Sequence, residues 1–154
     1  MEALFSAVRT GDLAQIKTLL QSAPSLVNAK DPRGFTPLTL ATYMNQSETT
    51  GYLLKQGADV DAQDAAGNTA LMGVCFKGHL SLAEILINHG ASINLQNRTG
   101  STALIFAATF GQSEMVQFLL KNGADATVKD QNGLTALNHA QQKGHEALAG
   151  ILAA

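Results

Sequence analysis

A fixed interval of 33 residues recurs along this 154-residue chain and limits what the chain can fold into. Glycine, threonine and leucine each return at that interval, in the same order, four times. The recurring residues are Gly34, Gly67, Gly100 and Gly133, then Thr36, Thr69, Thr102 and Thr135, then Leu38, Leu71, Leu104 and Leu137. Self-similarity at a period of roughly 20–50 residues is the signature of repeat architectures, so we expect a stack of similar units.

Each unit has the residues of a turn followed by two helices. Residues 31–34 begin with Asp and end with Gly, which is typical of a type I turn. Thr36 can then cap a helix whose first residue is Pro37. A residue that tolerates left-handed backbone ends this first helix, namely Asn45, Gly78, Gly111 or Gly144. A second helix follows, for example over residues 113–121, and it stops before Gly57, Gly90 or Gly123.

The unit resembles the ankyrin repeat. The matching motifs are Thr36-Pro37-Leu38, Gly78-His79, Leu119-Leu120 and Gly57-Ala58-Asp59-Val60. The resemblance implies an all-α fold, an α-solenoid of stacked helix-turn-helix repeats with hairpin-like turns between units. It implies one domain over residues 1–154, made of a divergent N-terminal capping repeat (1–30), full repeats (31–63, 64–96, 97–129) and a C-terminal capping repeat (130–154).

The chain departs from the family pattern at two places. The histidine of the family's Thr-Pro-Leu-His motif is replaced by Thr39, Met72, Ile105 and Asn138, so the usual histidine ladder between units is not expected. The second helix of unit 31–63 contains Thr49, Thr50 and Gly51, which are weak helix formers. We therefore predict that this helix is the least protected of the interior helices.

Charge and cysteine content argue against several functions. Ten basic against twelve acidic residues give a net charge of −2, so no basic stripe for nucleic acid is expected. Cys75 is a single cysteine with no histidine in phase beside it. The histidines, His79, His89, His139 and His145, lack metal-ligand spacing. We expect no metal, no cofactor, no catalytic residue and hence no enzymatic activity.

The sequence shows no segment for insertion into a membrane. The longest apolar run, residues 103–110, is interrupted by Thr109 and is far shorter than the roughly 20 residues of a spanning helix. The N-terminal residues lack the apolar region of a signal peptide. The sequence as it stands indicates a cytoplasmic location, whereas removal of a leader would make this a periplasmic or exported form.

Positions that vary between units are the candidates for binding. In the family that the chain resembles, binding uses the turn tips and the exposed end of each first helix. The chain has six phenylalanines, two tyrosines and no tryptophan, yet half of these aromatics fall at such positions. The candidate protein-binding residues are Arg33, Phe35, Tyr43, Met44, Phe76, Lys77, Arg98, Phe110 and Lys143. The alternative is that Phe76 and Phe110 fold back over Leu71 and Leu104 as part of the core.

These features predict a non-enzymatic module that binds another folded protein through its concave face. A five-unit chain with no second module has nothing to bridge, which favours masking or inhibition of one partner, as in immunity or self-protection proteins that cap an enzyme. The alternative is a scaffold or adaptor subunit of a larger complex. We expect a monomer, with weak self-association through the nearly uncharged C-terminal helix, residues 145–154, as the alternative.

Overall fold

The chain is all-helical, as the sequence predicts. The computed structural model describes residues 1–154 and contains ten α-helices, one 3₁₀-helix and no β-strand. The helices are α1 (Glu2–Thr10), α2 (Leu13–Ser22), η1 (Pro24–Asn28), α3 (Pro37–Tyr43), α4 (Ser47–Lys55), α5 (Ala70–Lys77), α6 (Leu80–Asn88), α7 (Ala103–Thr109), α8 (Ser113–Lys121), α9 (Ala136–Gln142) and α10 (Glu146–Ala153). None of them has the length and apolar character needed to cross a membrane.

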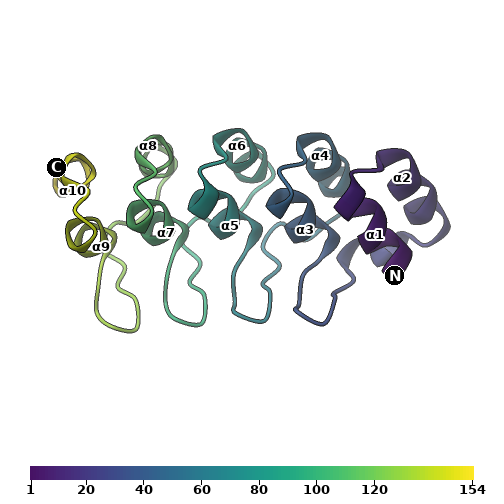
Figure 1. The fold of residues 1–154 in the computed structure, drawn as a ribbon, viewed down its shortest axis with the longest axis horizontal. Coiled ribbons are helices and arrows are strands. Elements are labelled where there is room, and N and C mark those ends of the chain that lie inside the picture. The colour runs from purple at the N-terminus through teal and green to yellow at the C-terminus, as the bar shows by residue number, and fades with distance from the viewer.

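The helices form two parallel rows, with long loops projecting from one side (Figure 1). The inner row, next to the loops, consists of α1, α3, α5, α7 and α9, and each of these packs against the next. The outer row consists of α2, α4, α6, α8 and α10. The two termini lie at opposite ends of the stack (Figure 1). We call the side formed by the loop tips and the inner helices the inner face.

Threonine begins each inner helix after the first. The Thr36 side chain accepts a hydrogen bond from the Thr39 amide at 3.2 Å, and the Thr39 hydroxyl accepts one from the Thr36 amide at 2.8 Å. Thr135 and Asn138 form the same reciprocal pair at the start of α9. Thr39 and Asn138 stand where the family motif has histidine, so here that position closes the first turn of its own helix.

Hydrogen bonds between units come from other side chains. The residue before each of three outer helices reaches a carbonyl of the preceding unit, in the bonds Gln46 to Val8, Gln112 to Phe76 and His145 to Thr109. Successive loop tips are also joined by one backbone hydrogen bond each, Ala65 to Arg33, Arg98 to Ala66 and Gln131 to Thr99. These bonds link each loop to the next and so fix the spacing of the inner face.

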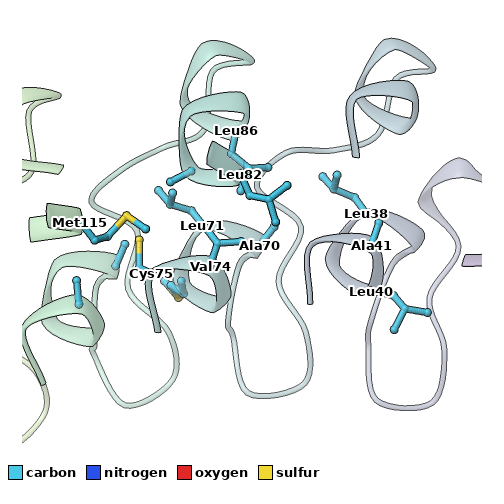
Figure 2. Close-up of a cluster of buried hydrophobic side chains, with 14 of the residues drawn as sticks. Leu38, Leu40, Ala41, Ala70, Leu71, Val74, Cys75, Leu82, Leu86 and Met115 are labelled. Atoms are coloured by element: carbon cyan, nitrogen blue, oxygen red, sulfur yellow. The ribbon is translucent and has the colours of Figure 1, made fainter. Parts of the chain in front are cut away.

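Leucines at the repeated positions form the core between the two rows. Leu82 and Leu86 of α6 point toward Leu71 of α5, and Cys75 points toward Met115 of the next unit (Figure 2). The side chains of Leu38, Leu71 and Leu104 are at most 2% exposed. Leu137, at the same position of α9, is only half-buried because α9 has a neighbouring inner helix on one side alone.

Candidate protein-binding surface

Large apolar side chains are exposed at the ends of the inner helices. Tyr43 and Met44 follow one another at the end of α3, Phe76 lies in the last turn of α5, and Phe110 caps α7. Their exposed fractions are 54%, 42%, 42% and 49%. Phe76 and Phe110 therefore do not fold back into the core over Leu71 and Leu104. We call Phe35, Tyr43, Met44, Phe76 and Phe110 the aromatic face.

The rings of this face form two pairs, one across neighbouring units and one within unit 31–63. Phe76 and Phe110 meet edge to face with ring centroids 4.4 Å apart and planes at 72°. Phe35 and Tyr43 lie 6.4 Å apart in a tilted arrangement. Contact between aromatic rings in these geometries is worth about 0.5–1.5 kcal/mol beyond burial. The rings thus hold one another in place on the surface.

Phe35 differs from the other rings. It is half-buried and packs against the core instead of standing free at its turn tip. The guanidinium carbon of Arg33 lies 4.5 Å from the centroid of its ring. Phe35 therefore leaves only part of its ring exposed and anchors the loop tip with the rest.

Lys77 connects two units of the face. Its Nζ lies 3.6 Å from the centroid of the Tyr43 ring and donates a hydrogen bond to the Tyr43 carbonyl oxygen at 3.1 Å. That carbonyl belongs to the C-terminal end of α3, where the helix dipole favours a positive charge. The lysine side chain is consequently half-buried and its charge is already engaged within the chain.

Arg33 is held by the carboxylate of Asp31 at 3.0 Å. Burial raises the pKa of Asp31, but hydrogen bonds from the Phe35 amide and from Arg33 outweigh it, and the pKa lies below its usual range. The carboxylate is therefore ionised at neutral pH and keeps the guanidinium over Phe35.

Two predicted residues lie apart from these contacts. Arg98 is exposed at the tip between α6 and α7, and its guanidinium makes no hydrogen bond or ion pair within the chain. Lys143 is exposed at the end of α9, beyond the Phe76–Phe110 pair. They add positive charge beside the aromatic face without contacting its rings.

A groove in this surface has no counterpart in our sequence prediction. It has a volume of about 290 Å³ and lies between α3, α5 and the turns that precede these two helices, with one residue of α7 at its edge. Its lining includes Phe35, Tyr43, Phe76 and Phe106 together with Gly73, whose position in the repeat carries Leu40, Phe106 and His139 in other units. A glycine among large side chains at one repeat position was the available signal, because it leaves a gap in the row.

The remaining reactive side chains are not gathered into a site. No group of three or more His, Cys, Asp or Glu is placed to hold a metal ion. Cys75 is fully buried, and burial raises the pKa of its thiol far above the usual range. His139 pairs with Asp130 at 2.7 Å in the last unit. What the surface presents is aromatic rings, a methionine and cations, a set suited to binding.

The comparisons with known proteins agree with this architecture. The family model "Ankyrin repeats (3 copies)" matches residues 1–64 and 57–130. The human DNA-binding protein RFXANK is 47% identical over 49 residues, which are 32% of this chain and 19% of that protein. Ankyrin repeat domain-containing protein 29 of Danio rerio is 41% identical over 59 residues, 38% of this chain and 20% of that protein.

The matched segment therefore spans about a fifth of each of these relatives. The family match is wider, because it covers every unit from the N-terminus to residue 130. Ankyrin repeats are protein–protein interaction modules, generally without enzymatic activity. With its repeated turns, paired helices and family match, this chain belongs to the ankyrin repeat family.

Proposed function

We propose that the chain binds a folded protein through the aromatic face and masks the partner surface that it covers. The observation that carries this proposal is the gathering of Tyr43, Met44, Phe76 and Phe110 on one face, each more than two-fifths exposed. Contiguous exposed apolar side chains rimmed by polar ones are typical of interaction sites. These four side chains are not part of the buried core, so core packing does not explain why large apolar residues stand at these positions.

The chemistry of the face suits tight binding. Aromatic and arginine side chains are the most frequent hot spots of protein interfaces, at about 2 kcal/mol or more each. The rings are already ordered by mutual contact and by Lys77. Binding to a preformed surface loses less conformational entropy than binding to a mobile one. The exposed cations Arg98 and Lys143 favour acidic groups at the rim of the partner's surface.

The shape of the inner face supports a masking role. Loops tied tip to tip and helices packed side by side present one continuous wall. A stable interface buries about 800 Å² on each partner, and any active surface beneath it is closed to other molecules. If the partner is an enzyme, the chain would then act as its inhibitor, as immunity proteins do.

The test is a pull-down from the native source with the purified chain as bait. The triple variant Tyr43→Ser, Phe76→Ser and Phe110→Ser should lose the captured partner and keep the wild-type melting temperature. A matched control replaces three exposed residues of the outer helices, Lys55→Ser, Gln117→Ser and Lys121→Ser, and should capture normally.

The outcomes separate the alternatives. Collapse of thermal melting with capture retained would mean that the rings are structural and that binding lies elsewhere. For masking, the partner's own activity should fall at a stoichiometric amount of the wild-type chain and not of the triple variant. Capture of two partners that are lost by different surface variants would instead indicate a scaffold or adaptor.

A further inference from the structure

The turn carboxylate of unit 64–96 differs from its counterparts in the other units. The first residue of each turn accepts hydrogen bonds from two backbone amides through one side-chain oxygen, and in three of the four turns its second side-chain atom is also hydrogen-bonded within the chain. Oδ2 of Asp31 accepts a hydrogen bond from Arg33, and Nδ2 of Asn97 donates one to Asn68. Oδ2 of Asp130 is paired with the imidazole of His139. In Asp64, Oδ1 accepts from the amides of Ala66 and Asn68 at 2.9 Å each, while no donor of the chain reaches Oδ2.

The last unit shows what would fill this place. His139 and Asp130 stand at the same repeat positions as Gly73 and Asp64, 66 residues earlier in the sequence. There the imidazole Nε2 lies 2.7 Å from the carboxylate Oδ2. Gly73 has no side chain, and a Cβ built on it would meet nothing within 4 Å. The groove over Gly73 is thus the space that an imidazole occupies in the last unit, with its carboxylate partner still present.

Asp64 is the unpaired charge of this groove. Asp64 and Lys77 are the charged residues of its lining, and Lys77 is engaged with the ring and carbonyl oxygen of Tyr43. Arg33, next to Phe35, is neutralised by Asp31. A purely apolar occupant would take the Asp64 carboxylate out of water without a donor, which is strongly unfavourable. The groove therefore requires a donor, and preferably a cation.

We propose that the groove over Gly73 takes one arginine side chain of the protein partner. Its guanidinium donates to Oδ2 of Asp64, and its plane lies against the rings of Phe76 and Phe106. Arginine fits this combination better than lysine because it is planar, stacks on aromatic faces and donates in a fork to a carboxylate. The inference rests on the proposed function, since it names the group that the aromatic face would recognise.

Two substitutions isolate the groove. Gly73→His should place an imidazole where the last unit has His139, so that it fills the groove and pairs with Asp64. Asp64→Asn should remove the charge and keep the turn, because Asn97 already makes the same turn, accepting from the amides of Thr99 and Ser101. Asp130→Asn is the matched control, the same change at the equivalent turn away from the groove.

The probe is a random linear peptide library displayed on phage and selected on the wild-type chain. Peptides that are lost on the Gly73→His variant should share an arginine at a fixed place. A synthetic peptide of that sequence should bind the Asp64→Asn variant at least tenfold more weakly than the wild type or the Asp130→Asn variant. Replacing its arginine by citrulline, which has the same shape without the charge, should weaken binding to the wild type similarly.

Three results would overturn the inference. The first is that no selected peptide loses binding to the Gly73→His variant. The second is that the peptides lost on this variant share an aliphatic or aromatic residue instead of arginine. The third is that the peptide binds the Asp64→Asn variant as tightly as the wild type. Circular dichroism melts of both variants establish that they fold. If the native partner is lost with the triple aromatic variant and retained by both groove variants, the proposed function stands and the arginine site falls.

Discussion

The hydroxyl of Thr50 lies buried in α4 without a hydrogen-bond partner. A buried polar group left unsatisfied costs about 1–3 kcal/mol. We expect Thr50→Val, which keeps the shape and removes the hydroxyl, to raise the free energy of unfolding by about 1 kcal/mol. Chemical denaturation measures the change.

Thr42→Val is the matched control, because the Thr42 hydroxyl donates to the Thr39 carbonyl oxygen at 3.0 Å. That substitution should leave stability unchanged or lower it. A Thr50→Val variant that is less stable than the wild type would show that its hydroxyl is satisfied in solution.

Asp31 and Asp130 make the stability of the chain sensitive to acid. Burial raises the pKa of Asp130, but hydrogen bonds from His139 and from the Leu134 and Asn132 amides outweigh it, so its pKa lies below the ordinary value of 3.8, as does that of Asp31. The unfolded chain then takes up protons at a higher pH than the folded chain, and acid favours unfolding. We expect the melting temperature to fall as the pH drops through about 4 and below.

The double variant Asp31→Asn and Asp130→Asn should show a shallower decline over this pH range. Asparagine already stands at the same turn position in unit 97–129, where Asn97 accepts from the turn amides, and this indicates that the turns will form. Glu48→Gln, an exposed change on α4, serves as the control. An unchanged pH profile in the double variant would assign the acid sensitivity to other groups.

At the scale of a single helix, we expect α4 to be the least protected of the interior helices. It contains Thr49, Thr50 and Gly51, which are weaker helix formers than the residues of α8, whereas neither helix has a side-chain cap at its N-terminus. We expect its amides to exchange with deuterium faster than those of α8, which has an identical length and ends in the same lysine. Slower exchange in α4 than in α8 would contradict this prediction.

Gly51→Ala should slow that exchange selectively. The glycine has ordinary helical backbone, and a Cβ there meets nothing within 4 Å. Alanine is favoured over glycine inside a helix by about 0.8–1 kcal/mol. Equal slowing across all helices would point to a global change instead of a local one in α4.

The repeat predicts the helices well because each boundary has a chemical marker. Residues 113–121 were expected to be helical and form α8, and Asn45 adopts the left-handed backbone expected where α3 ends. The sequence placed Phe35 among the positions that vary between units and so among the candidates for binding. Spacing alone does not show that its ring packs against the core. The groove over Gly73 was missed because periodicity draws attention to residues that recur, whereas this site depends on one that does not.

The whole molecule is held together by contacts between neighbouring units, so its two ends have half the support of its middle. The N-terminal unit compensates by burying Leu4, Phe5 and Val8, each at most 3% exposed. The C-terminal unit buries less, with Leu137 half-buried and α10 containing Gly150. We expect α9 and α10 to unfold first as urea is raised, which exchange measured at stepwise urea concentrations resolves.

Gly150→Ala should raise the protection of α10 by about 0.8–1 kcal/mol and leave that of α2 unchanged. Its Cβ would meet nothing within 4 Å. If the amides of α9 and α5 in the wild type lost their protection at the same urea concentration, the chain would unfold as one cooperative block.

The tip-to-tip hydrogen bonds tie each loop only to its immediate neighbours, and this restricts how the aromatic face can evolve. A duplicated copy of residues 97–129 placed after residue 129 lengthens the molecule and leaves the Phe76–Phe110 pair intact. A copy of residues 31–63 placed after residue 96 instead puts an extra layer between those two rings and dismantles the pair, because Met44 stands at the repeat position of Phe110. The surface can therefore be transplanted as a contiguous block of three repeats or extended from its ends, but it cannot grow from within.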